Sequence, residues 1–216
     1  MLRRLLIVTA VLAERDAVLA GLGGRSVYPH PLAENAYELT VLAVGVGPVA
    51  AAAGTARQLG LAEAAGAPYS AVVCAGIAGG FAGRTEVGDV VLGTASVAAD
   101  LGADSPDGFL PIDALGFGSS RVECAGLLAV QAKAGEILTV TTATGTAERA
   151  EALADAHPDA LAEAMEGFGA ATAAQLAGLP YAEVRAISNL IGPRDTSTWR
   201  FDLAFAALSN AFREQP

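Results

Sequence analysis

Apolar positions recur along the whole chain, in short runs and in longer alanine-rich stretches. The short runs predict strands over residues 5–10, 37–44, 71–75, 87–98, 136–142 and 182–188. The longer stretches predict helices over residues 14–22, 49–65, 147–156 and 202–212. Strands that alternate with helices predict an α/β fold in which helices cover both faces of one sheet, a three-layer α/β/α sandwich.

Two stretches fit this alternation less well. Residues 101–119 are rich in Gly, Pro and Asp and predict the longest irregular loop, and long loops in compact domains are often functional. Residues 160–166 favour a helix by propensity. Because there is no internal repeat and no shift of composition, we expect a single domain over residues 1–216.

The charge of the chain bears on its partners. The formal net charge is −10, and Lys133 is the single lysine. Because phosphate backbones are bound by clustered Lys and Arg, this balance argues against a nucleic-acid partner. An anionic small substrate would need arginines placed locally around it.

The first strand and the cysteines bear on the compartment. Arg3 and Arg4 precede an apolar run like that of a signal segment, but the charged residues 14–16 follow at once and favour a buried strand. No stretch reaches the ~20 apolar residues that a membrane span needs. Two cysteines, Cys74 and Cys124, make no disulfide framework. We therefore expect a cytoplasmic protein without a membrane partner.

Two glycine-rich segments follow predicted strands. Gly45 and Gly47 precede a predicted helix, as in the dinucleotide-binding fingerprint. The next strand ends without the acidic residue that would bind a ribose, so a tight turn is the better interpretation and we expect no cofactor. Residues 76–80 predict a second turn, either structural or a cradle that lets a ligand approach the backbone.

Two carboxylates are candidates for chemistry. Glu14 follows the first strand, where α/β folds place their sites, although an acid in the first turn of a helix often only complements the helix dipole. Glu166 stands alone among small and apolar residues, and a buried carboxylate is costly unless a partner or a substrate hydroxyl satisfies it.

Polar residues cluster after the last predicted strand. Ser188 and Asn189 lead into Arg194 and Asp195, and such clusters past a strand's carboxyl end are site candidates. Trp199 and Phe201 follow and offer flat apolar surface, for a ligand or simply for the core. The two histidines, His30 and His157, have no ligand spacing to a Cys, an Asp or each other, so we expect no metal site.

Taken together, these pieces resemble the nucleoside phosphorylase and nucleosidase superfamily along nearly the whole chain. The matching segments, in order, are Glu14 and residues 45–47, 76–80, 87–91, 165–167 and 185–188. The resemblance implies a twisted, mostly mixed central sheet and a homo-oligomer, a dimer or larger. It also implies that a strand ends at Met165 and that a helix begins at Gly167, against the propensity of residues 160–166.

The resemblance also implies roles for individual residues, on a small purine nucleoside as the substrate. Met165 and Glu166 would bind the ribose, and Glu14 would position the attacking water. Both carboxylates suit a bond cleavage that passes through an oxocarbenium-like sugar. The base would lie against four residues: Gly76, Ile77, Thr144 and Asn189.

Two differences from the sequence motifs of related enzymes indicate which acceptor and which base take part in the reaction. Phosphorolytic relatives carry an arginine shortly before the glycine turn, whereas residues 70–75 contain none, so water is the expected acceptor. Adenosine-type nucleosidases have an Asp where this chain has Asn189. An amide both donates and accepts hydrogen bonds, and this suits a 6-oxopurine.

The run from residue 187 to Asp195, with Trp199, and residues 144–149 are similar to the futalosine hydrolase family. That similarity implies release of hypoxanthine from futalosine, with Asp195 as a candidate proton donor. Arg194 or Arg200, with Trp199, would bind the carboxylated aryl group on the 5′ side. The alternatives are another purine nucleosidase or phosphorylase, a non-catalytic nucleoside-binding module, and a dinucleotide-dependent oxidoreductase.

Overall fold

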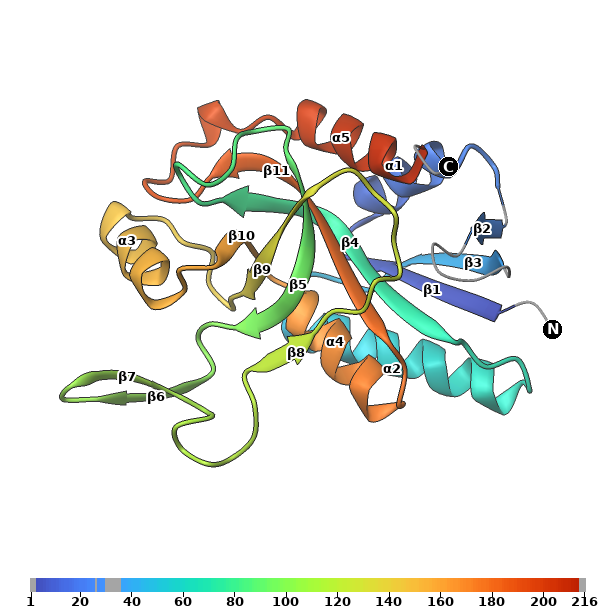
Figure 1. Ribbon diagram of the computed structural model, residues 1–216, viewed down its shortest axis with the longest axis horizontal. Coiled ribbons are helices and arrows are strands. Elements are labelled where there is room, and N and C mark those ends of the chain that lie inside the picture. Colours follow the sequence, from blue (N-terminus) through green and yellow to red (C-terminus); the bar gives the residue numbers. More distant parts are fainter. Residues whose placement is uncertain (1–2, 26, 30–35, 214–216) are drawn as a thin grey trace.

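The computed structural model describes residues 3–25, 27–29 and 36–213 and contains one large mixed sheet with helices on both faces (Figure 1). His30 lies outside the described residues. The order of the strands in the nine-stranded sheet is β10-β9-β5-β11-β4-β1-β3-β2, and β8 pairs with β5. The bounds of these strands are β1 Arg3–Thr9, β2 Val27–Pro29, β3 Ala36–Ala43, β4 Ala71–Gly80, β5 Val90–Ala98, β8 Arg121–Glu123, β9 Lys133–Thr139, β10 Ala160–Ala164 and β11 Tyr181–Leu190.

The helices form the two outer layers. Their bounds are α1 Leu12–Leu22, α2 Pro48–Ala64, α3 Ala147–Ala156, α4 Gly167–Leu176 and α5 Phe201–Arg213. Helices α1 and α5 pack on one face of the central strands, through Val18, Leu208 and Phe212, while α2 and α4 cover the other face (Figure 1). Because alanines dominate α4, it approaches the sheet closely. The sandwich predicted from the alternating pattern is confirmed.

The sheet is mixed, and it closes on itself at one end. β4 pairs in parallel with β1 and with β11, whereas β11 pairs antiparallel with β5. β10 is parallel to β9 and returns to pair antiparallel with the end of β4, at Gly79 and Gly80. This closure brings the carboxyl ends of β4, β10 and β11 together, and the candidate site lies there.

The glycine turn predicted over residues 76–80 is wrong, because β4 continues through all five residues. Neighbouring strands on both sides supply backbone partners for this segment. At Gly80, a Cβ would lie 2.9 Å from Cγ2 of Ile187 and would also collide with the Thr85 hydroxyl. The glycines therefore permit close packing inside the sheet and do not end the strand.

Tertiary pairing also overrides propensity in residues 160–164, which form β10 and not the helix that propensity favours. This strand is buried between β9 and β4, and α4 begins at Gly167, as the family resemblance implied. The predicted irregular loop over residues 101–119 contains a hairpin, β6 (Gly102–Ser105) and β7 (Gly108–Pro111), which projects from the body of the molecule (Figure 1). Among the described residues, no helix is long and apolar enough to cross a bilayer.

Candidate active site

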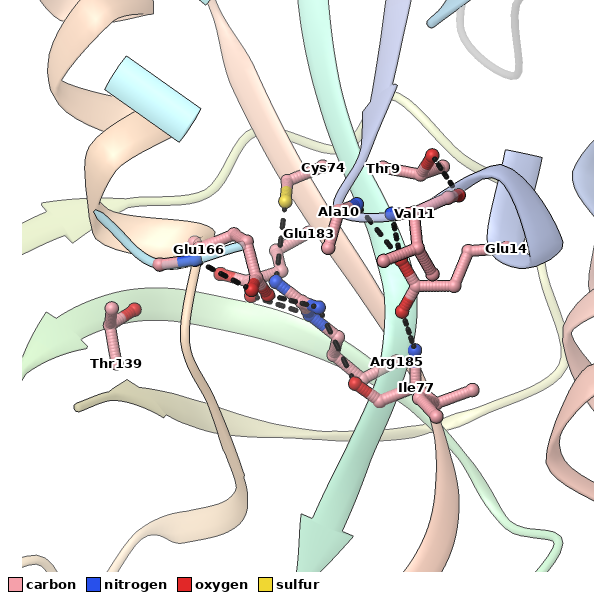
Figure 2. Close-up of polar contacts among 12 residues, drawn as sticks. Thr9, Ala10, Val11, Glu14, Cys74, Ile77, Thr139, Glu166, Glu183 and Arg185 are labelled. Atoms are coloured by element: carbon pink, nitrogen blue, oxygen red, sulfur yellow. Dashed lines mark hydrogen bonds and ion pairs between the residues drawn. The ribbon is translucent and has the colours of Figure 1, made fainter. Parts of the chain in front are cut away.

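Glu14 lies in the first turn of α1, with its carboxylate turned inward and only 3% of its surface exposed. Its Oε2 accepts hydrogen bonds from the backbone N–H groups of Ala10 (2.8 Å) and Val11 (3.2 Å). Its Oε1 accepts a hydrogen bond from the N–H of Ile77, at 2.9 Å (Figure 2). The carboxylate is thus held by the end of β1 and by the middle of β4, which fixes its direction.

Gly76 allows this approach. A Cβ at this position would lie 2.5 Å from Oε1 of Glu14 and 2.7 Å from Nη1 of Arg185. Burial raises the pKa of Glu14, and the positive charge of Arg185 partly opposes that rise. A carboxylate of this kind takes up a proton more readily than an exposed glutamate does.

Glu166 is the second buried carboxylate, with 5% of its surface exposed, and it directly precedes α4. Its Oε1 accepts a hydrogen bond from the N–H of Gly47, which directly precedes α2, at 3.1 Å. Its Oε2 lies 3.1 Å from Nη1 of Arg185. The carboxylate therefore faces the amino ends of two helices, where the helix dipoles favour negative charge.

Arg185 lies between the two carboxylates and is fully buried (Figure 2). Its Nε donates to Oε1 of Glu183 at 2.9 Å, and its Nη1 donates to Glu166. Nη1 also lies 3.4 Å from the carbonyl oxygen of Ile77, and Nη2 lies 3.3 Å from Sγ of Cys74. Glu183 and Glu166 contact this guanidinium, and the charge of Glu14 also acts on it. Three negative charges therefore face one positive charge, and the excess negative charge attracts a further cationic group.

The sequence analysis assigned no role to Arg185 or Glu183. A signal was present, because two charges separated by two positions in an apolar strand point to the same face. Such a pair is costly to bury unless its members neutralise each other. The structure shows the two side chains in contact, and both are fully buried.

A second group of predicted residues lies further along β4, around Gly79. Gly79 pairs with Asn189 of β11 on one side and with Glu163 of β10 on the other. Thr144 joins this group because both its backbone N–H and its hydroxyl donate to Glu163. Asn189 and Thr144 therefore flank one glycine, whereas Gly76 and Ile77 lie beside Glu14.

The amide of Asn189 is half-buried and already partly engaged. Its Oδ1 lies 2.8 Å from the hydroxyl of Ser188, and its Nδ2 donates to the carbonyl oxygen of Leu190 at 3.0 Å. An amide oxygen accepts two hydrogen bonds and an amide nitrogen donates two. One acceptor and one donor position therefore remain for a ligand.

An apolar groove of about 490 Å³ adjoins Glu166 between the amino ends of α2 and α4. Met165, which precedes Glu166, is half-buried at the end of β10. Thr139 accepts a hydrogen bond from the N–H of Phe168 at 2.8 Å, and both residues line the groove. The other lining residues are Pro48, Val49, Ala52, Ala53, Ala98, Asp100, Leu101, Thr141, Gly169 and Thr172.

The predicted residues of the segment 194–200 lie at the surface. Asp195 caps a short 3₁₀ turn, accepting from the N–H (3.0 Å) and hydroxyl (2.6 Å) of Ser197. These hydrogen bonds lower the pKa of Asp195, and a low pKa does not favour a proton donor. Arg194 stacks over the ring of Trp199, at 4.9 Å, and Arg200 pairs with Asp202 at 3.0 Å.

This segment is nevertheless attached to the rest of the site. The N–H of Arg194 donates to the carbonyl oxygen of Gly145, next to Thr144, at 3.1 Å. The N–H of Arg200 donates to the carbonyl oxygen of Ser188 at 2.8 Å. In the part of the chain that the structure describes, no group of three or more His, Cys, Asp or Glu side chains is arranged to hold a metal ion.

Comparisons with known proteins bear on the family and on the fold. The chain matches the phosphorylase superfamily over residues 23–214. It is 47% identical to a futalosine hydrolase of Streptomyces coelicolor, covering 96% of this chain and 92% of the relative, and 44% identical to one of Acidothermus cellulolyticus, covering 96% and 91%. Two solved structures from Helicobacter pylori share the fold. One is a 5′-methylthioadenosine/S-adenosylhomocysteine nucleosidase, at TM-score 0.76 and 21% identity over 99% of this chain and 96% of that one. The other is a futalosine hydrolase, at TM-score 0.74 and 22% identity over 99% and 95%.

The matching family and relatives place this fold, with its two buried carboxylates, among the nucleoside-cleaving enzymes. The chain belongs to the phosphorylase superfamily and, within it, to the futalosine hydrolase family. It is therefore an N-glycosyl hydrolase of the nucleosidase type.

Proposed function

We propose that this enzyme hydrolyses the N-glycosidic bond of futalosine and releases hypoxanthine and dehypoxanthine futalosine, a step of the alternative route to menaquinone. The observation that carries the proposal is the 47% identity to a futalosine hydrolase over 96% of the chain. The chemistry of the buried carboxylates supports the same reaction.

Glu166 binds the ribose in this proposal. A carboxylate offers about four acceptor positions, and Gly47 and Arg185 fill two of them. The remaining two match the two hydroxyls of a ribose cis-diol. As the bond to the base breaks, the sugar becomes cationic, and the negative charge of Glu166 stabilises it where the charge develops. Met165 contributes apolar contact beneath the sugar.

Glu14 orients the attacking water. Three backbone N–H groups fill three of its acceptor positions, so about one remains for a water molecule. The water adds its oxygen to C1′ of the ribose, and Glu14 takes the proton that the water loses. The base takes up a proton from solvent water and leaves with the electron pair of the broken bond. Ile77 and Gly76 serve this step by holding Glu14 in place.

Asn189 selects the base. Its remaining donor position faces the O6 atom of hypoxanthine and its remaining acceptor position faces the protonated N7. Thr144, held by Glu163 on the other side of Gly79, closes the base site. An adenine presents an amino group at the same position and leaves the amide donor unpaired, which costs affinity.

Water is the acceptor because neither of two arginines beside β4, Arg185 and Arg84, is free to bind phosphate. Arg185 is surrounded by carboxylates. Arg84, just beyond β4, donates to the carbonyl oxygens of Ala154, His157 and Ala160 at 2.8–2.9 Å. Phosphate binding would require one of these arginines to leave its partners.

The 5′ group of the substrate lies toward the exposed segment, where Trp199 covers the aryl ring. Arg194 or Arg200 pairs with its carboxylate. Among the described residues, Arg194 forms no ion pair with a carboxylate, whereas Arg200 is paired with Asp202. That difference favours Arg194 as the residue that recognises the substrate.

Two further proposals concern the oligomeric state of the enzyme and its cellular compartment. Exposed apolar side chains on and near the β6–β7 hairpin, Phe109, Leu110 and Phe117, support a homo-oligomer of two or more copies. The free thiols of Cys74 and Cys124 support a reducing, cytoplasmic compartment.

The decisive experiment measures base release from three nucleosides, with and without phosphate. We expect release of hypoxanthine from futalosine at a rate independent of phosphate, and slower cleavage of inosine and 5′-methylthioadenosine. A preference for 5′-methylthioadenosine would assign the enzyme to the adenine-releasing nucleosidases instead. A rate that depends on phosphate would assign it to the phosphorylases.

A further inference from the structure

Glu183 is a fully buried carboxylate that the reaction described above does not use. Its Oε1 accepts from Nε of Arg185, and its Oε2 lies 3.1 Å from the hydroxyl of Tyr181. Burial raises its pKa, and the charge of Arg185 opposes this rise. Removing such a group from water is costly, so its presence under the site requires an explanation.

The position of Glu183 is enforced by the start of α4. A Cβ at Gly167 would collide with both carboxylate oxygens of Glu183. The hydroxyl of Tyr181 also lies 3.0 Å from the carbonyl oxygen of Gly167. Glu183 is therefore locked between β11 and the residue that directly follows Glu166, and glycine at position 167 is the condition for this packing.

The consequence concerns the direction of Arg185. A guanidinium has five N–H donors and prefers to meet a carboxylate with two of them. Here Glu183 takes the Nε–H and Cys74 lies against Nη2, so that only Nη1 contacts Glu166. Without Glu183, the guanidinium is free to turn and pair with Glu166 through two N–H groups. It would then occupy the acceptor positions that a ribose needs.

We propose that Glu183 is a positioning residue, which holds Arg185 to a single contact with Glu166 and so keeps that carboxylate open to the ribose hydroxyls. It neutralises Arg185 at the same time, so that the guanidinium does not cancel the electrostatic attraction between Glu166 and the cationic sugar. The inference rests on the proposed role of Glu166 in binding the ribose.

The test compares kcat/KM for futalosine with that for its 2′-deoxy analogue, which lacks one of the hydroxyls that Glu166 binds. A hydrogen bond to a charged group is worth roughly a tenfold to hundredfold effect. In the wild-type enzyme we expect futalosine to be preferred by about that factor. In Glu183→Gln, the overall rate should fall and the preference should shrink by about tenfold. The neutral amide holds Arg185 more weakly than the carboxylate does, so Arg185 can turn and occupy the acceptor position on Glu166 that the 2′-hydroxyl uses.

A merely structural role gives a different result. A general loss of folded enzyme lowers the rates for both substrates equally and leaves their ratio unchanged. An unchanged ratio in Glu183→Gln would overturn the proposal. Glu151→Gln, on the exposed face of α3, removes one negative charge far from the cluster and is expected to leave both rates and their ratio as in the wild type.

A second variant covers the case in which Glu183→Gln does not fold. Glu183→Asp keeps the charge but withdraws it from Arg185 by one methylene, so the ratio should fall in the same direction by a smaller factor. A wild-type ratio in folded Glu183→Asp would also contradict the proposal.

If futalosine is not the substrate, the same ratio is measured with the purine nucleoside that is cleaved and its 2′-deoxy form. The assignment of the substrate and the role of Glu183 can therefore fail separately.

Discussion

The two groups of residues that the sequence marks as candidates differ sharply in their surroundings. The carboxylates Glu14 and Glu166 are buried and held by backbone N–H groups and by Arg185. The residues of the segment 194–200 are mostly exposed, and Asp195 is engaged within its own turn. A buried, fixed charge acts strongly on a developing charge, whereas an exposed one is weakened by solvent. We therefore propose that the chemistry belongs to the buried cluster and that the exposed segment recognises the substituent that varies among nucleosides.

The largest expected loss of activity concerns the buried carboxylate Glu166. Glu166→Gln removes the negative charge beside the ribose while keeping the shape of the side chain. We expect kcat to fall by roughly 10²–10⁴, the range for a preorganised charged group, as measured by hypoxanthine release under saturating substrate. Glu151→Gln is the matched control. A rate close to that of the wild type would remove Glu166 from the mechanism.

The second effect concerns Glu14 and pH. Glu14 must be ionised to accept a proton from water, and burial raises its pKa. kcat/KM should therefore fall as the pH is lowered, with a midpoint above that of an ordinary glutamate. Glu14→Gln should lower kcat/KM by roughly 10² and abolish this acid limb. An unchanged acid limb in the variant would assign the titration to another group.

Base selection should respond less strongly. Asn189→Asp replaces the amide donor by a carboxylate, which repels the O6 atom of hypoxanthine and suits an adenine that is protonated at N7. We expect kcat/KM for futalosine relative to 5′-methylthioadenosine to fall by about tenfold, the value of one good hydrogen bond to a charged group. Unchanged selectivity would exclude Asn189 from the choice of base.

The exposed arginines should affect binding more than chemistry. Arg194→Met should raise KM for futalosine by roughly threefold to tenfold with kcat nearly constant, since a partly solvated ion pair contributes modestly. The same change should leave KM for inosine, which lacks the carboxylate, unaltered. Arg200→Met is the matched comparison. A larger effect at Arg200 would reverse the assignment between the two.

The smallest effect is expected at Asp195. Asp195→Asn keeps an acceptor for the 3₁₀ turn, and we expect kcat to change by less than about threefold, within the range typical of exposed positions. The measurement is again hypoxanthine release. A loss of a hundredfold or more would show that Asp195 donates the proton to the leaving base, and the contrast between the buried and exposed groups would then fail.

Features that depend on neighbouring residues could be predicted from the amino-acid sequence alone. The helix over Ala147–Ala156 was predicted with its bounds, because His157 and Pro158 end the helical stretch, and the structure adds a cap in which the Thr146 hydroxyl accepts from the N–H of Arg149. The tight turn at Gly45 and Gly47 was also predicted, and both residues have a positive φ there. Glu14 became a candidate through its place after the first strand, and Glu166 as a lone acid among small and apolar residues, and both features are visible without coordinates.

Features that depend on residues far apart in the chain could not be predicted and became visible only in the folded protein. Residues 160–164 became a strand because β9 and β4 supply its backbone partners, and β4 continued through its glycines because β10 and β11 flank it. Gly167, Glu183 and Arg185 form one packed unit, and only the fold shows that the glycine makes room for the paired charges. Helical propensity is a local quantity of a few tenths of a kcal/mol per residue, whereas strand pairing and buried charge depend on distant partners that only the fold brings together.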